Sequence, residues 1–216
     1  MKKYNTICIN LPEDTTRKQF MQKQFDNLNL DVEYIYSPRP HEGYGSSNYQ
    51  FAGEQGVLRS QLKGITTFIE SEIPLLIFED DVHIDETTVS KIDYFLNQQI
   101  EDWGILYLGG APKAKLRETN YKDISIVSEF TQACGYMLNH KVLKNFVIFC
   151  FDRMGLPFPN ACYDNMLNDY FLHQENLTMY AFDPPLVYQV AGYSTLRKGH
   201  RDYVELIRQQ WEIYKK

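Results

Sequence analysis

Three consecutive carboxylates, Glu79-Asp80-Asp81, directly follow the apolar run of residues 74–78. Such a run predicts a buried strand, and open α/β sheets bind ligands at the C-terminal ends of their strands. Side chains alternate along an extended segment, so we expect Glu79 and Asp81 on the same side. Carboxylates this close repel one another, and Mg²⁺ or Mn²⁺ would relieve the repulsion because both prefer oxygen ligands. The triplet predicts a metal site able to hold a nucleotide diphosphate, with a solvated acidic loop as the alternative.

The segments around the triplet alternate between strand-like and helix-like patterns. Strands are predicted over residues 6–9, 32–36 and 74–78, with amphipathic helices between and after them. Beyond residue 110 the pattern is mixed, and no internal repeat or linker is visible, so we predict one α/β domain. The helical stripes are Met21, Phe25 and Leu28, then Leu58, Leu62, Ile65 and Ile69, then Val89, Ile92 and Leu96; later strands are predicted over 123–127 and 133–138, and a helix from about His140.

Residues 39–53 are rich in Pro, Gly and Ser. This composition predicts a long surface loop beside the site. Its glycines give backbone freedom and its aromatic side chains could stack on a base or sugar, so we expect a mobile lid that orders over a bound donor. An ordinary surface loop is the alternative.

Several segments, in the same order, resemble glycosyltransferase family 25, the family of lipooligosaccharide and collagen galactosyltransferases. Residues 76–82 resemble its "DxD-type" metal motif. The other similar segments are residues 7–11 with Arg17 ("INL…R"), 56–62 ("GxxxSH"), 103–109 ("WDxxxLG"), 163–167 ("D-x-x-L") and 184–189 ("PPLxxQ").

The resemblance implies the GT-A architecture, a Rossmann-like mixed sheet flanked by helices in a single domain over residues 1–216. Residues 1–110 would bind the nucleotide sugar and the metal, and residues 111–216 the acceptor. The implied reaction is metal-dependent, inverting transfer of a hexose, with galactose expected. The donor would be a nucleotide diphosphate sugar such as UDP-hexose, and the acceptor a hydroxyl of a glycan or lipooligosaccharide.

The resemblance also suggests roles for individual residues. Such a transfer needs charge stabilisation of the leaving diphosphate, a grip on the nucleoside and a base for the acceptor hydroxyl. Within the triplet, Asp81 is expected to bind Mn²⁺ or Mg²⁺ directly, Glu79 to bind the metal or the ribose, and Asp80 to support them. The other expected donor-binding residues are Asn10, Leu11, Arg17, Ser60 and Gln61.

Asp164 is the expected general base, since its segment matches the one that contributes a carboxylate on the acceptor side. Ordinary carboxylates are ionised at neutral pH, so Asp164 could accept a proton without special tuning. The alternative interpretation makes Asp164 a plain N-cap of the following helix. Glu129 and Asp183 are the rival carboxylates.

Two positions depart from the family pattern. Gln61 stands where the family shows His, although an amide can still donate and accept hydrogen bonds. Residues 192–195 lack the acid that family members often show after the "PPLxxQ" segment. His200 is then a candidate late metal ligand, with simple surface exposure as its alternative.

Composition and charge limit the classes of function. A net charge of -6 argues against a protein that coats nucleic acid, and 44% hydrophobic residues are ordinary for a globular enzyme. The start of the chain leaves no room for a signal peptide and no apolar span is visible, so we expect a cytoplasmic protein.

Residues 196–216 form a basic tail that could contact phosphates, an anionic membrane surface or a polyanionic acceptor. The polar face of a terminal helix is its alternative interpretation. Two further functions stay open: a phage- or virus-type glycosyltransferase acting on hydroxymethylated DNA bases, and a metal-dependent nucleotide-diphosphate hydrolase.

Overall fold

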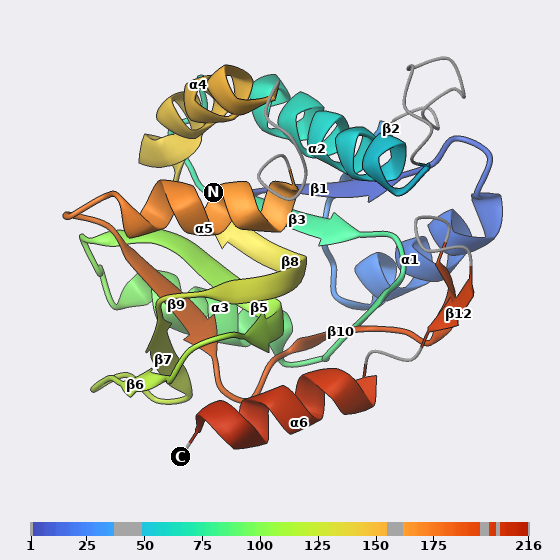
Figure 1. The fold of residues 1–216 in the computed structure, drawn as a ribbon. Coiled ribbons are helices and arrows are strands. Elements are labelled where there is room, and N and C mark those ends of the chain that lie inside the picture. Colours follow the sequence, from blue (N-terminus) through green and yellow to red (C-terminus); the bar gives the residue numbers. More distant parts are fainter. Residues whose placement is uncertain (1, 37–48, 155–161, 195–198, 202–203, 216) are drawn as a thin grey trace.

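The computed structural model describes residues 2–36, 49–154, 162–194, 199–201 and 204–215, and it is built around one mixed sheet (Figure 1). The strands that the sequence predicts in the first half of the chain are confirmed. Strands β1 (Asn5–Asn10), β2 (Glu33–Tyr36) and β3 (Leu75–Glu79) are parallel, with β1 between the other two. Because parallel strands end at one edge of a sheet, Asn10 and Glu79 reach the same edge.

The second half extends this sheet with antiparallel and parallel pairings. The strand order is β2-β1-β3-β8-β5-β9-β7-β6, and β10 crosses to pair with β4 and β5. The strands β11 and β12 form a separate pair. The bounds are β4 Val82–Ile84, β5 Trp103–Pro112, β6 Arg117–Glu118, β7 Ile124–Val127, β8 Phe130–Leu138, β9 Thr178–Phe182, β10 Val187–Gln189, β11 Gly192–Ser194 and β12 Gly199–Arg201.

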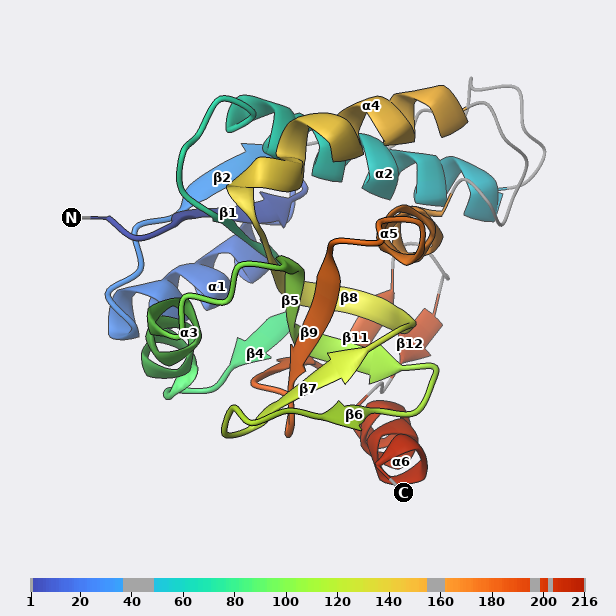
Figure 2. The same cartoon turned by 90° about the vertical axis from the view of Figure 1, so that its left-hand side faces the viewer.

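Helices cover both faces of the sheet (Figures 1 and 2). On one face lie α2 (Tyr49–Thr67), α4 (Leu143–Arg153) and α5 (Tyr163–Leu172), and on the other lie α1 (Thr15–Asn27) and α3 (Thr88–Asn97). A short 3-10 helix, His140–Val142, precedes α4. The predicted stripes supply the two cores: Leu58, Leu62 and Ile65 are buried on the first face, and Met21, Phe25 and Ile92 on the second. Apolar burial of this kind is the main force that holds the helices on the sheet.

The chain after residue 203 forms the terminal helix α6 (Val204–Tyr214), which supports the helix interpretation of the basic tail. Ile207 and Trp211 are buried, and the indole Nε1 of Trp211 donates to the carbonyl of Gly110 at 2.9 Å. Lys215 pairs with Asp183 at 2.7 Å, and Arg208 lies 3.5 Å from Glu205. Both cations therefore have acidic partners, while their side chains stay exposed at the surface.

The predicted loop over residues 39–53 is wrong at its C-terminal end, because helix α2 already begins at Tyr49. The helical pattern of the following residues extends back through Gly53 and overrides its composition. Residues 39–48, and with them most of the predicted lid, lie outside the described residues. No helix within the described ranges is long and apolar enough to cross a membrane.

Strand β10 crosses tightly over two glycines of neighbouring strands. A Cβ added at Gly109 would overlap the backbone carbonyl of Val187, and one at Gly135 would press on the Val187 side chain. The glycines therefore let β10 lie close enough to pair with β5, and this places Gln189, the last residue of β10, at the edge where β3 ends.

This packing predicts that Gly109→Ala lowers the free energy of unfolding by about 1–3 kcal/mol, since a backbone atom cannot move aside as a side chain can. Gly64→Ala is the matched comparison, because the closest atom to its Cβ would be the flexible end of Ile7 and its other near contacts are ordinary ones to side chains. The variant would also gain helix propensity. Urea unfolding of both variants checks this. Equal losses would contradict the close approach of β10.

Candidate functional site

The acidic triplet lies where β3 ends and the chain turns into β4. Glu79 is the last residue of β3, and Asp80 and Asp81 form the turn. Asn10 lies at the end of the neighbouring strand β1, and the first turn of α1 begins five residues further on. The predicted strand thus delivers its acids to the C-terminal edge of the parallel part of the sheet.

Asp80 is held on both of its carboxylate oxygens. Asn10 donates its Nδ2 to Asp80 Oδ2 at 2.7 Å, and Arg17 donates Nη1 to Oδ1 at 2.8 Å. Asp80 and Asn10 are buried, at 7% and 2% exposure. Both oxygens of Asp80 are therefore used inside the protein, and the supporting role of Asp80 at a metal stays a prediction. The Oδ1 of Asn10 is buried and without a described partner, which leaves an acceptor beside the triplet.

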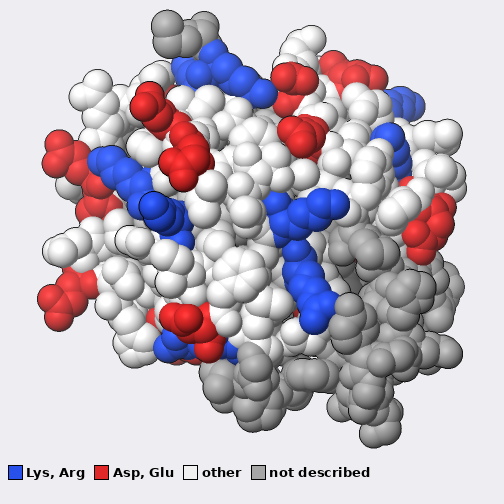
Figure 3. All heavy atoms as spheres, turned by 90° about the horizontal axis from the view of Figure 1, so that it is seen from above, with Lys and Arg blue, Asp and Glu red and all other residues white. Residues whose placement is uncertain are grey.

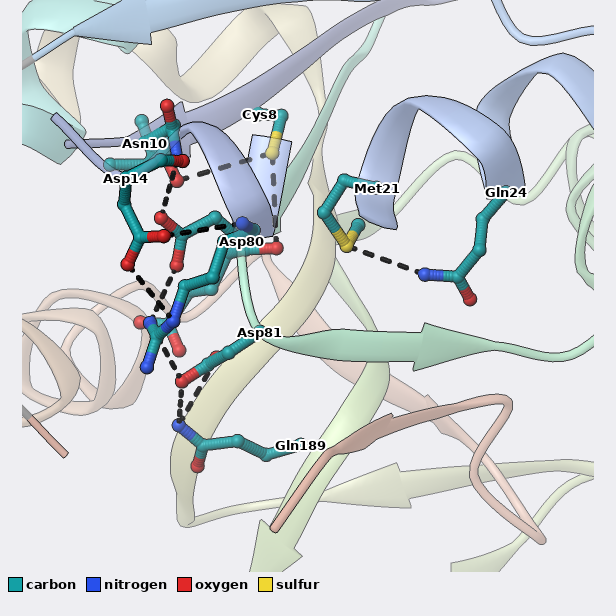
Figure 4. A network of polar contacts seen from close by, with 11 residues as sticks. Cys8, Asn10, Asp14, Met21, Gln24, Asp80, Asp81 and Gln189 are labelled. Carbon is teal, nitrogen blue, oxygen red and sulfur yellow. Dashed lines mark hydrogen bonds and ion pairs between the residues drawn. The ribbon is translucent and has the colours of Figure 1, made fainter. Parts of the chain in front are cut away.

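Asp81 contacts the same guanidinium group and also Gln189, whose side chain points toward the Asp81 carboxylate in Figure 4. Asp81 Oδ2 lies 3.3 Å from Arg17 Nη1, and Gln189 Nε2 donates to the two Asp81 oxygens at 3.1 and 3.3 Å. The backbone also joins the strands, since Val190 N donates to the Asp81 carbonyl at 2.7 Å. Burial raises the pKa of Asp81, against the opposing effects of Arg17 and Gln189.

Arg17 reaches the triplet from the first turn of α1. Asp14 caps this helix by accepting the backbone N–H of Arg17 at 3.2 Å, and its other oxygen lies 3.4 Å from Arg17 Nε. Burial opposes the charged guanidinium, but Asp81 and Asp80 outweigh it and raise the pKa of Arg17. One cation, Arg17, therefore lies within ion-pair distance of three carboxylates.

Glu79 is the first residue of the triplet and ends β3, the strand that pairs with β8 of the second half. Its burial, together with the charges of Asp81 and Asp164, raises the pKa of Glu79 well above its ordinary value. The charges of both carboxylates thus act on Glu79 in the same direction. Arg17 opposes them and lowers the pKa of Glu79.

Asp164 lies in the first turn of α5 and turns its carboxylate onto strand β8. Its Oδ2 accepts the backbone N–H of Gln132 at 2.7 Å and lies 3.4 Å from the Thr131 hydroxyl. Gln132 has a positive φ of 54°, an uncommon conformation for a residue other than glycine. Burial raises the pKa of Asp164, while the N–H groups of Gln132 and Ala133 oppose the shift.

The N-cap interpretation of Asp164 is wrong, because the N-cap position of α5 is Cys162 and the Asp164 carboxylate bonds to another strand. The rival carboxylates lie in other surroundings. Glu129 is exposed, and Asp183 pairs with Lys215. Asp164 is therefore the half-buried carboxylate of the second half whose charge raises the pKa of Glu79.

Ser60 and Gln61 lie on α2, outside the hydrogen-bonded network of the triplet. The Ser60 hydroxyl donates to Gly56 in its own helix at 2.7 Å, and Gln61 accepts from the Tyr136 hydroxyl at 2.9 Å. The Tyr136 and Tyr163 hydroxyls lie 2.6 Å apart, so Gln61 is linked to the residue before Asp164. Leu11 follows β1 and its carbonyl accepts from Asp14 N. The donor-binding roles of these three predicted residues stay predictions.

The metal ligands also stay predictions. The backbone of His200 lies in β12, but its side chain is outside the described residues. Within the described ranges, no group of three or more His, Cys, Asp or Glu side chains is arranged to hold a metal ion. Magnesium commonly binds through one or two carboxylates together with substrate phosphates, and Asp81 and Glu79 offer the right oxygen chemistry for that mode. The donor set therefore fits a metal that binds together with a diphosphate.

A separate cavity of about 430 Å³ lies between α2 and α4. It is lined by Leu62, Lys63, Phe151 and Met154, among others, and by no residue of the triplet. Seen from above, Lys and Arg side chains lie at several separate places on the surface, one of them near the middle, with Asp and Glu side chains between them (Figure 3). The cavity is thus distinct from the candidate site.

Two residues of the network were not among the predicted site residues. Gln189 binds Asp81 and Asp14 binds Arg17. Asp14 carried only a helix-start signal, and Gln189 carried a signal as the end of the segment that resembles "PPLxxQ". A contact between residues 108 positions apart cannot be read from local spacing.

Neither a protein-family model nor a curated protein matches the sequence. Among solved structures, a glycosyltransferase involved in the glycosylation of the major capsid of PBCV-1 is similar, with a TM-score of 0.55 and 10% identity. The match covers 96% of this chain and 100% of that one. A mannose-1-phosphate geranyltransferase from Thermus thermophilus reaches a TM-score of 0.45, with 9% identity over 84% of this chain and 74% of that one.

A putative glucose-1-phosphate thymidylyltransferase from Bacillus anthracis, in complex with a sucrose, gives 0.44, with 11% identity over 83% and 87%. These last two scores are too low to carry an argument. The first likeness extends over the whole of its chain and confirms the predicted fold class, a GT-A-like mixed α/β sheet flanked by helices. The resemblance to family 25 itself stays a prediction.

Proposed function

We propose that this protein is a metal-dependent, inverting glycosyltransferase that moves a hexose from a nucleotide diphosphate sugar to a hydroxyl of a glycan. The observations that carry the proposal are the acidic triplet beside the Arg17 cation at the end of β3, and the half-buried Asp164 of the second half, whose charge raises the pKa of Glu79. Galactose, a UDP donor and a lipooligosaccharide acceptor are the more specific form of the proposal.

The first half supplies the groups that a nucleotide diphosphate needs. Arg17 is a cation with a planar fork suited to phosphate oxygens, and Asn10 offers an unpartnered buried acceptor that suits a base or ribose donor. Asp81 and Glu79 would hold Mn²⁺ or Mg²⁺, which would stabilise negative charge on the leaving diphosphate. The location agrees with ligand binding at the C-terminal edge of parallel strands.

The second half supplies the base. Asp164 is a carboxylate whose pKa is raised by burial, so it holds a proton more strongly than an exposed Asp would. It is kept in place by Gln132 and would accept the proton of the acceptor hydroxyl as the oxygen attacks the sugar. Attack from the face opposite the diphosphate inverts the anomeric centre.

A donor screen tests the proposal. Thermal melts with UDP-glucose, UDP-galactose and GDP-mannose, each with and without Mn²⁺, should show a rise in Tm for one donor that depends on Mn²⁺, because binding to the folded state stabilises it. The selected donor, incubated with a panel of glycan acceptors, should then give a glycosylated product of inverted configuration by mass spectrometry and NMR. No Tm response to any nucleotide sugar would contradict the proposal.

The same assay separates the two other functions. A nucleotide-diphosphate hydrolase would cleave the phosphoanhydride bond and release nucleoside monophosphate at an equal rate with or without acceptor. A DNA-modifying enzyme would label hydroxymethylated duplexes. In the described part of the basic tail, Arg208 and Lys215 form exposed pairs with Glu205 and Asp183, so acidic side chains offset the charge that a DNA acceptor would need. The glycan acceptor therefore stays the proposal.

A further inference from the structure

Arg17 already occupies the place beside the triplet where a second cation would have to enter. Its Nη1 lies 2.8 Å from Asp80 Oδ1 and 3.3 Å from Asp81 Oδ2. Asp81 is better placed than Asp80 to take a metal, because its contacts with Gln189 and Arg17 are 3.1–3.3 Å long, whereas Asn10 and Arg17 hold the two oxygens of Asp80 at 2.7 and 2.8 Å. A metal on Asp81 and a guanidinium on the same carboxylate would compete and repel each other.

We infer that Arg17 is a resident counter-ion of the triplet, which a divalent metal displaces from Asp81, and that Arg17 then turns to the phosphate oxygens of the donor. The inference rests on the proposed function where it takes a diphosphate as the ligand. The other part of the inference, the competition between Arg17 and the metal, depends only on the protein and the metal. Arg17 is thus a positioning residue that couples metal binding to donor binding.

The contacts of the two carboxylates explain why the displacement can be partial. Asp80 is buried and held by Asn10 at 2.7 Å, so its bond to Arg17 can persist while the guanidinium leaves Asp81. Asp81 keeps a partner when Arg17 leaves, since Gln189 Nε2 donates to it at 3.1 Å. Release of Arg17 from Asp81 therefore leaves neither carboxylate without a hydrogen bond.

The inference predicts opposite effects of Arg17→Gln on two ligands. Mn²⁺ alone, measured by the loss of the free Mn²⁺ signal in electron paramagnetic resonance, should bind the variant about tenfold more tightly than the wild type, because the competing charge is gone. UDP in saturating Mn²⁺, measured by calorimetry, should bind the variant about tenfold more weakly, because a charge-assisted bond to phosphate is lost. General damage to the site would weaken both.

Lys18→Gln is the matched control, since it removes the neighbouring positive charge. Lys18 donates to the Tyr36 hydroxyl at 2.6 Å and lies over the Tyr34 ring, away from the carboxylates of the triplet. Both affinities of this variant should stay within about twofold of the wild type. Arg17→Lys, which keeps the charge but not the fork, should change both affinities in the same directions by less, and it replaces Arg17→Gln if that variant does not fold.

The outcomes separate this inference from the proposed function. Unchanged or weaker binding of Mn²⁺ alone by the Arg17 variants would contradict the competition between Arg17 and the metal, whatever the result with UDP. Unchanged or tighter binding of UDP by these variants would contradict the contact between Arg17 and the donor phosphates. Failure of wild-type protein to bind UDP with or without Mn²⁺ would instead contradict the proposed function, and the comparison of Mn²⁺ alone would still decide whether Arg17 competes with a metal.

Discussion

Asp164→Asn is expected to lower the turnover number about 100- to 10,000-fold while the affinity for the donor changes little, because removal of a general base affects the transition state and not ground-state binding. The amide keeps one oxygen that can accept the Gln132 N–H, so the fold of β8 should persist. Initial rates at saturating donor and acceptor, together with donor affinity from calorimetry, measure both quantities.

The control is Asp169→Asn, which makes the same chemical change on the same helix, five residues from Asp164. This variant should keep a turnover number within about twofold of the wild type, as surface substitutions away from special features have small effects. A near-normal rate for Asp164→Asn would contradict the role of general base. Asp164 would then serve only to accept the backbone N–H of Gln132, whose φ is positive.

The pH dependence adds a second test of the same residue. Asp164 must be ionised to act as a base, and burial raises its pKa above the ordinary value of 3.8. The value of kcat/KM should therefore fall as pH falls through the raised pKa, on a limb that Asp164→Asn lacks. The stability effect has the opposite direction: because the folded pKa is raised, the contribution of Asp164 to stability is greatest at low pH and is lost as pH rises through that pKa. Asn should then be no less stable than Asp at neutral pH.

The first half of the fold could be predicted because its signals are local. Apolar runs of strand length predict β1 and β3, and apolar stripes at spacings of three and four residues predict α1 and α2. The apolar residues of these patterns are buried in the structure, as the patterns imply. The predicted loop over residues 39–53 overlaps the first turn of α2, because glycine and aromatic residues taken alone suggest a loop. Packing of the helix on the sheet outweighed that composition.

The site was only partly predictable, since its contacts join distant parts of the chain. The triplet and Asn10 could be identified because each ends a strand that is visible in the sequence. Their partner Gln189 depends on the crossing of β10 over Gly109 and Gly135, which no local pattern reveals. The hydrogen bond from Gln132 N to Asp164 likewise depends on the positive φ of Gln132, which no local sequence pattern predicts.

Asp81→Asn is expected to weaken Mn²⁺-dependent binding of a UDP sugar about 100-fold or more, which corresponds to ~2.8 kcal/mol, because the neutral amide is a much poorer ligand for a divalent cation. The fold should persist, since the amide can still accept from Gln189 Nε2 and the backbone bond from Val190 is unchanged. Calorimetry with and without Mn²⁺ measures the effect, and circular dichroism checks the fold.

Glu86→Gln is the matched control for Asp81→Asn, because it removes an exposed carboxylate five residues further along the chain. Its Mn²⁺-dependent affinity should equal that of the wild type, which would show that the loss in Asp81→Asn reflects a ligand and not a change in net charge. If Asp81→Asn bound the donor as tightly as the wild type in Mn²⁺, Asp81 would have no role as a metal ligand. The Arg17 guanidinium would then be the cation left at the triplet to meet the diphosphate, and Arg17→Gln alone should abolish donor binding.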